Sequence, residues 1–99
     1  MSQLTVKQRQ YLKGLAHPLE PVVMIGDKGL TEAVLKEINT SLLAHELIKI
    51  RVLGDDRKLR TDMIQQICAS SGAELVQHIG KLLVVYKAHP KTPKIKLEV

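Results

Sequence analysis

The residues best suited to chemistry lie in the stretch VVMIGDKGLTEAVLKEI, residues 22–38. An apolar run ends at Gly26, two charged residues follow, and an amphipathic helical pattern begins directly after Gly29. Two glycines this close let the backbone turn sharply and let another backbone approach, because no Cβ stands in the way. The first amides of the following helix attract an anion, and Lys28 at the tip adds a positive charge. The pattern Gly26-Asp27-Lys28-Gly29 therefore predicts a loop that contacts phosphate groups.

A Gly-x-x-Gly motif is short, so a purely structural turn is the alternative interpretation. Two features favour phosphate binding, because the loop comes directly before a helix and contains Lys28. KH domains clamp a single-stranded nucleic-acid backbone with a loop that works by the same physics.

Residues for catalysis or metal binding do not converge. The chain has no Gly-x-Ser-x-Gly elbow, no P-loop and no Rossmann fingerprint. Cys68 is the only cysteine, so neither a disulfide nor a cysteine-based zinc site can form, and a half-buried helical thiol is expected. The histidines lack the spacing of metal ligands: His17, His45, His78 and His89. We therefore expect a protein that is not an enzyme and that needs no metal or cofactor.

The net charge of +5 is concentrated at the two ends of the chain. Residues 1–16 carry three basic side chains and no acid, and residues 81–99 carry five lysines against Glu98. Such ends attract a polyanion most strongly if the fold brings them together, although a solubilising lysine-rich surface is an equally good interpretation. The only aromatic residues, Tyr11 and Tyr86, are expected in the core, so no aromatic platform is available for stacking bases. Binding to a nucleic acid should therefore read its backbone and shape, with little direct discrimination between bases.

The hydrophobic pattern predicts the element order αβαβαββ. Helices are expected from Thr5 or Ser2 to Ala16, from Thr31 past Leu42, and from Asp55 or Asp56 to Gly72; strands are expected at 21–25, 46–53, 74–79 and 82–87. The apolar run 21–25 predicts a strand covered on both faces, whereas 46–53 alternates and predicts one solvated face. A type II′ turn at Gly80-Lys81 joins the last two strands. The fold class is α/β, an α+β sandwich with a mixed four-stranded sheet packed with three helices.

The helices predict three apolar stripes that face the core. Their members are Leu4, Tyr11, Leu12, Leu15 and Ala16 in the first, Val34, Leu35, Ile38 and Leu42 in the second, and Leu59, Met63, Ile64 and Ile67 in the third. One domain is expected over residues 1–87, followed by a basic, proline-broken tail over 88–99 that either adds an edge strand or hangs free. Because no segment resembles a signal peptide or a membrane span, we expect a cytoplasmic protein. We also expect it to be a monomer.

Three segments resemble the bacterial YhbY family, the single-domain form of the CRM domain (chloroplast RNA splicing and ribosome maturation). They are KQRQYLKGLAHPLEPVVMIGDKGLTEAVLKEI, HELIKIRVL and GAELVQHIGKLLVVYK, within a resemblance that runs from Leu4 to Lys87. It implies an RNA-binding module whose fold is similar to the C-terminal domain of a bacterial translation initiation factor. It also implies association with precursors of the large ribosomal subunit, and the plant relatives act in group II intron splicing. The family often has a lysine directly after the first loop glycine, where this chain has Asp27.

The sequence thus predicts a non-enzymatic RNA-binding protein that acts in ribosome assembly on precursor ribosomal RNA of the large subunit. The predicted contacts are the loop residues Gly26, Asp27, Lys28 and Gly29 and a basic surface of Lys7, Arg9, Lys13, Lys36, Lys49 and Arg51. The alternative is a protein-interaction module that docks on a ribosomal protein or assembly factor without touching RNA.

Overall fold

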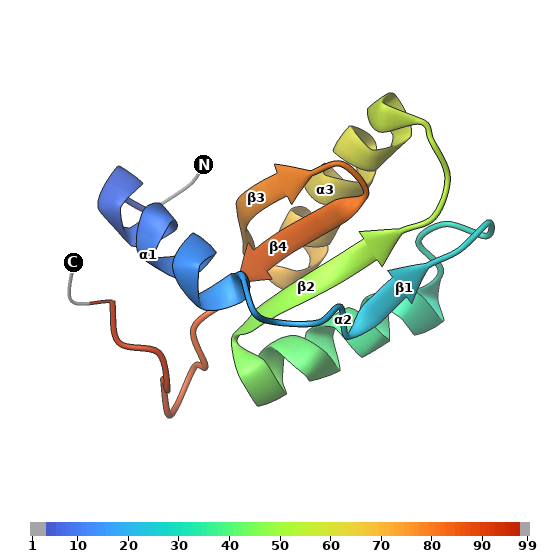
Figure 1. Ribbon diagram of the computed structural model, residues 1–99. Coiled ribbons are helices and arrows are strands. Elements are labelled where there is room, and N and C mark those ends of the chain that lie inside the picture. The colour runs from blue at the N-terminus through green and yellow to red at the C-terminus, as the bar shows by residue number, and fades with distance from the viewer. Residues whose placement is uncertain (1–3, 98–99) are drawn as a thin grey trace.

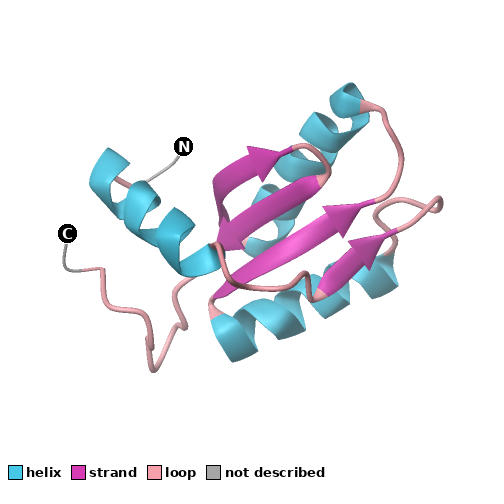
Figure 2. Ribbon diagram, in the orientation of Figure 1, coloured by secondary structure: helices cyan, strands magenta, loops and turns pink. Residues whose placement is uncertain are grey.

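The computed structural model describes residues 4–97, which form three helices and one mixed sheet (Figures 1 and 2). The elements are α1 (Val6–Ala16), β1 (Val23–Ile25), α2 (Glu32–His45), β2 (Leu47–Val52), α3 (Arg57–Ser71), β3 (Glu74–Ile79) and β4 (Leu82–Tyr86). The predicted order αβαβαββ and the mixed four-stranded sheet are confirmed.

The strands lie in the order β1-β2-β4-β3, with β1 parallel to β2 and both other pairs antiparallel. The hairpin β3–β4 closes with Ile79 opposite Leu82, so Gly80 and Lys81 form a two-residue turn. Gly80 has a φ of 54°, and Lys81 is not among the residues with positive φ, as a type II′ turn requires. The parallel pair matters most for function, because the loops that follow β1 and β2 leave the sheet at the same edge.

Capping residues fix where each helix begins. Thr5 forms a capping box with Gln8, and the side chains of Thr31 and Asp56 accept hydrogen bonds from the amides of Val34 and Leu59. At the other end of α3, Gly72 adopts the left-handed conformation of a C-cap. These caps agree with the sequence analysis. Of the two alternatives, Asp55 pairs with Lys81 instead of capping α3, and Ser2 lies outside the described residues.

The two faces of the sheet are covered unequally. Helices α2 and α3 cover one face and build the main core, whose fully buried members include Ile25, Ile38, Ile50, Ile67 and Leu83. Helix α1 covers only part of the other face, where a second cluster forms from Leu12, Ala16, Leu47, Val76, Val84 and Tyr86. The connection from α1 to β1 crosses this face near the start of β2, and no helix covers the half of the face that carries Met24 and Arg51 (Figure 1).

Four predictions about burial are wrong. Leu15, expected on the core-facing stripe of the first helix, is 38% exposed. β1 is an edge strand with helices against one face only, so Met24 is 57% exposed instead of covered on both sides. Tyr11 is 41% exposed because α1 contacts the sheet mainly through Leu12 and Ala16, whereas the expected burial of Tyr86 is confirmed. Leu59, in the first turn of α3, is 50% exposed because the helix begins beyond the edge of the main core.

The chain after β4 is folded onto the domain, although residues 88–97 form no helix or strand. The buried carboxylate of Glu46 accepts hydrogen bonds from the backbone amides of His89, Lys94 and Ile95 at 2.7, 2.8 and 2.7 Å. Ile95 and Leu97 pack against the cluster under α1. The described part of the tail is thus neither an edge strand nor free, because an internal acid supplies the acceptors that a strand partner would have supplied.

Candidate nucleic-acid interface

The 26–29 loop is a tight turn that runs directly into α2. The amide of Gly29 donates to the carbonyl of Gly26 at 3.0 Å, and the amide of Thr31 donates to the carbonyl of Gly29 at 3.1 Å. Thr31 then caps the helix through a hydrogen bond of 3.2 Å from the amide of Val34. The first amides of α2 therefore point out beside the loop without an acceptor in their own helix, as helix N-termini do.

The two glycines of this loop have different reasons to be glycine. Gly29 has a φ of 71°, which strains any other residue, and a Cβ there would lie 3.7 Å from Cε of Met63. Gly26 has no such φ, and a Cβ there would meet nothing within 4 Å. The fold itself therefore explains Gly29 but not Gly26, whose bare backbone is free for contact with something outside the chain.

Lys28 and Asp27 project from the tip of the turn, and both side chains are exposed. Within residues 4–97, Lys28 makes no ion pair, so its charge is available to a ligand. Asp27 stands beside it with the opposite charge, and neither carboxylate nor ammonium is shielded by burial. The tip is consequently close to neutral, and attraction of an anion depends on the helix amides and on cations from neighbouring segments.

Two other segments meet the 26–29 loop at the same edge of the sheet, which we call the loop edge. The 53–56 segment follows β2, and the amide of Leu53 donates to the carbonyl of Ile25 at 2.9 Å. The 80–81 turn reaches the same place because the amide of Val52 donates to the carbonyl of Lys81 at 2.8 Å. The N-termini of α2 and α3 both lie at this edge, so two helix dipoles present their positive ends there.

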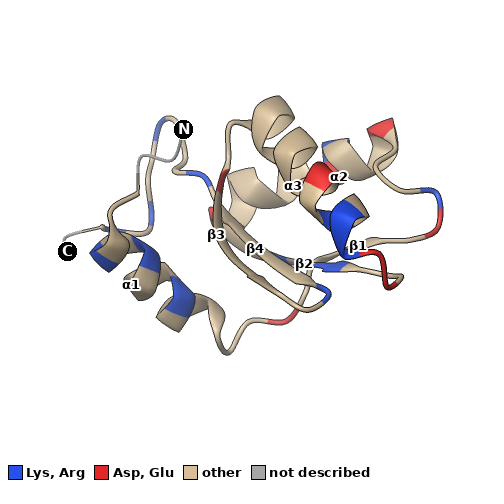
Figure 3. Cartoon of the chain, turned by 90° about the horizontal axis from the view of Figure 1, so that it is seen from above, with Lys and Arg blue, Asp and Glu red and all other residues tan. Residues whose placement is uncertain are grey.

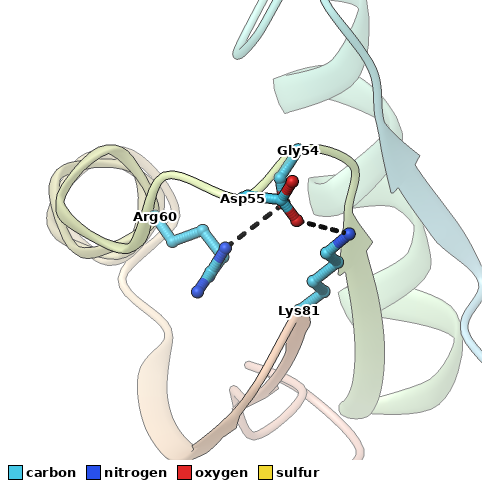
Figure 4. A network of polar contacts seen from close by, with 4 residues as sticks. All are labelled: Gly54, Asp55, Arg60 and Lys81. Atoms are coloured by element: carbon cyan, nitrogen blue, oxygen red, sulfur yellow. Dashed lines mark hydrogen bonds and ion pairs between the residues drawn. The ribbon is translucent and has the colours of Figure 1, made fainter.

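The loop edge is held by a small polar network (Figure 4). Nζ of Lys81 lies 3.0 Å from Oδ1 of Asp55, and this contact lowers the pKa of the exposed Asp55 carboxyl below its ordinary value. Arg60 is buried and donates to the carbonyl of Gly54 and to Nε2 of His78, both at 3.4 Å. Arg60 therefore serves the shape of the 53–56 segment, whereas Lys81 sits at the surface.

Lys81 is a candidate contact that the sequence analysis missed, together with Arg57 and Lys58 in the first turn of α3. All three side chains are exposed. The sequence reveals the Gly80-Lys81 turn, and the antiparallel pairing of β4 with β2 would have placed that turn next to the 53–56 segment. The sequence therefore shows the turn, but only the strand order places Lys81 at the loop edge.

The basic residues predicted to bind RNA are spread over three places. Lys49 and Arg51 lie on the open face of the sheet, where Nζ of Lys49 contacts the carbonyl of His17 at 3.5 Å. Lys36 is exposed on α2, on the opposite side of the sheet from α1. The α1 residues lie near the start of β2, a strand length of about 20 Å from the loop edge.

The α1 end forms a second basic region with the tail (Figure 3). Lys7 is exposed and Lys13 is half-buried, while Arg9 donates a hydrogen bond to the carbonyl of Leu75 and so helps to fix α1 on β3. The tail brings Lys91, Lys94 and Lys96 to this end, where Ile95 and Leu97 pack beneath α1. The fold thus brings the two basic chain ends together, at a distance from the 26–29 loop.

The residues considered for other chemistry have ordinary surroundings. Cys68 is half-buried as expected, and burial raises the pKa of its thiol, which keeps it protonated. Among residues 4–97, no three His, Cys, Asp or Glu side chains are grouped to hold a metal ion. No helix in this range is long and apolar enough to cross a membrane.

Comparison with known proteins gives a consistent answer. The chain is 52% identical over 87 residues to an RNA-binding protein of Haemophilus influenzae, with 88% of each chain covered. It is 41% identical to a Probable RNA-binding protein of Pseudomonas aeruginosa, with 92% of this chain and 88% of the relative covered. It is also 35% identical to the Probable RNA-binding protein YqeI of Bacillus subtilis, with 95% and 98% covered.

The fold and the family model agree with these relatives. The solution structure of SAV1595 from Staphylococcus aureus matches with a TM-score of 0.82 at 34% identity, covering 95% of this chain and 98% of that one. The family model described as CRS1 / YhbY (CRM) domain matches residues 4–87. The chain therefore belongs to the CRS1/YhbY (CRM) domain family.

Proposed function

We propose that this protein binds RNA through the loop edge and acts, without catalysing a reaction, as an assembly factor on precursors of the large ribosomal subunit. The observation that carries the RNA contact is Gly26, a glycine that the fold does not require, at the mouth of a helix N-terminus and beside the free charge of Lys28. A phosphate fits this position because backbone amides and a lysine can both donate to it. The names of the relatives support an RNA partner.

Because the charges of Asp27 and Lys28 oppose each other, attraction of RNA depends on the neighbouring cations. Asp27 offsets Lys28, and Asp55 and Asp56 offset part of the remaining positive charge at the same edge. The attraction of an anion therefore comes from the two helix N-termini together with Lys81, Arg57 and Lys58. Lys81 forms an ion pair with Asp55, but such an exposed pair contributes little stability, so Lys81 can contact a phosphate instead. Binding is therefore expected to be strongly dependent on salt.

The test is binding to fragments of large-subunit ribosomal RNA over a salt series. The variant Gly26→Asp with Lys28→Ala removes the phosphate position, and the empty space around residue 26 lets the variant fold, which circular dichroism checks. The control is Lys91→Ala, which removes one exposed lysine at the other end of the molecule. We expect lower affinity for the loop variant and a salt slope smaller by about 0.7 to 0.9 per lost phosphate contact. Equal binding by the loop variant and wild type would contradict the loop contact.

A second measurement addresses ribosome assembly and the alternative of a protein partner. Cell extracts are separated by sedimentation before and after nuclease treatment, and the protein is followed across the gradient. An assembly factor that binds RNA is expected with precursors of the large subunit and is released by nuclease. A complex that survives nuclease would favour docking on a protein instead.

A further inference from the structure

The open half of the sheet face carries a row of four side chains, one from each strand. The register pairs Met24 with Arg51, Arg51 with Leu82, and Leu82 with Ile79. Met24 is 57% exposed and Ile79 56% exposed, although both are apolar. Helix α1 covers the other half of this face and leaves the row uncovered (Figure 1). We call Met24, Arg51, Leu82 and Ile79 the open row.

Two cations and no acid lie on the open part of the sheet face. Arg51 lies in its centre with an exposed side chain, and Lys49 points from the same face two residues earlier in β2. The next row along the sheet contains Val22, which is 45% exposed and bonded through its amide to the carbonyl of Lys49. Neither row contains an Asp or Glu. The face is therefore suited to a partner that has both flat apolar surfaces and negative charges.

The open row borders the loop edge. Met24 precedes Gly26 by two residues, and Leu82 follows Lys81 directly. A ligand whose phosphates lie at the 26–29 loop can thus continue onto the row without leaving the protein surface. The row crosses four strands and spans about 14 Å, and sheets of this width in other RNA-binding modules hold two or three bases.

We propose that the open row binds the unpaired bases of a single-stranded RNA segment whose phosphates contact the 26–29 loop. The inference rests on the proposed function and adds the class of RNA that this surface selects. Aliphatic side chains cover the base faces, and the guanidinium of Arg51 stacks on a base as a planar cation. A duplex keeps the faces of its bases stacked inside, so it gains nothing from the row. The row thus takes the place of the aromatic platform that this chain lacks.

The test compares three RNA probes: a short oligouridine, the same strand with abasic sites at its centre, and a blunt duplex of equal length. The face variant is Met24→Ser with Ile79→Ser, and both positions are exposed, so the fold is retained. The control variant is Val6→Ser, which removes an apolar side chain that is 73% exposed on α1. Wild type and control are expected to bind the intact strand about tenfold more tightly than the abasic strand.

The face variant is expected to lose this preference and to bind the intact and abasic strands equally, while its affinity for the duplex stays that of wild type. The proposal is overturned if the abasic strand binds wild type as tightly as the intact strand. It is also overturned if the face variant keeps the full preference for the intact strand over the abasic strand. That result holds against the proposal even if the same variant loses binding to a protein. Failure of the proposed function looks different, because the loop variant would then bind every probe as wild type does.

Discussion

The buried carboxylate of Glu46 gives the sharpest prediction about the architecture. It accepts three backbone hydrogen bonds from the tail, and its own backbone carbonyl accepts a fourth from the amide of Lys87 at 2.8 Å. A hydrogen bond to a charged group contributes about 1.5 to 3 kcal/mol net. Glu46→Ala removes the acceptor of all three hydrogen bonds. Without them, residues 88–97 lack the interactions that keep this segment ordered. We expect this segment to detach and the free energy of unfolding to fall by about 2 to 4 kcal/mol, because the freed amides regain water.

Two further substitutions separate the carboxylate from the backbone. Glu46 has a φ of 64° and a ψ of −44°, a conformation that strains a non-glycine residue by about 1 to 3 kcal/mol. Glu46→Gly therefore loses the same hydrogen bonds but relieves strain, and we expect a smaller loss of stability than for Glu46→Ala. Glu46→Gln keeps one acceptor oxygen but places its NH2 group, a donor, against the amide of His89. We therefore expect the free energy of unfolding to fall by about 2 kcal/mol.

The assays are urea unfolding for stability and amide hydrogen exchange for the tail. In Glu46→Ala, the amides of His89, Lys94 and Ile95 should exchange as in an unfolded chain, while those of the sheet stay protected. Glu37→Ala is the control, because Glu37 is an exposed glutamate of α2, the helix whose C-cap is Glu46. Unchanged protection of the three tail amides in Glu46→Ala would refute the reasoning.

The same site predicts a dependence on pH. Burial by itself raises the pKa of Glu46, but the hydrogen bonds from the amides of His89, Ile95 and Lys94 outweigh it and hold the pKa below its ordinary value. A lowered pKa means that the stabilisation is complete above the ordinary carboxyl range of about pH 4 and is lost as the pH falls through the lower value. The NMR signals of the tail amides should therefore stay unchanged down to about pH 4 and shift together below it. Shifts that begin near neutral pH would contradict this.

Two other predictions concern the loop and the cysteine. Gly29→Ala should lower the free energy of unfolding by about 1 to 2 kcal/mol, because the φ of Gly29 is 71°. Gly26→Ala should change it by less than about 0.5 kcal/mol, since Gly26 has no such φ. Equal shifts of the urea midpoint in the two variants would show that the two glycines do not differ in this way. Cys68 should react slowly with a thiol reagent at neutral pH and speed up only at alkaline pH, because burial raises its pKa; fast modification of the folded protein at neutral pH would be inconsistent with that environment.

Local signals in the sequence were sufficient for the element order and for most helix ends. Thr5, Thr31 and Asp56 cap their helices through bonds that span three residues, so neighbouring residues alone specify them. The alternation in β2 likewise assigns Ile50 to the core and Arg51 to the open face. The Gly-x-x-Gly pattern identifies the candidate loop for the same reason, since turn and helix start are contiguous. The contacts proposed for that loop and for the basic residues remain predictions.

Features that depend on distant segments could not be obtained in this way. The exposure of Met24 depends on β1 being the edge strand, and the place of Lys81 depends on β4 pairing with β2. In the sequence, Glu46 stands only as the first residue of the strand expected at 46–53, because its carboxylate serves amides 43, 48 and 49 residues later in the chain. No local pattern encodes such a contact.

The sequence by itself therefore determined the elements, their order, the candidate loop and the charge of the two ends, because each depends on residues that are close together in the chain. Only the tertiary structure decided that three loops share one edge, that half of one sheet face stays open, and that the tail is tied down at Glu46. These depend on strand order and on where α1 crosses the sheet, which are set by packing among segments far apart in sequence.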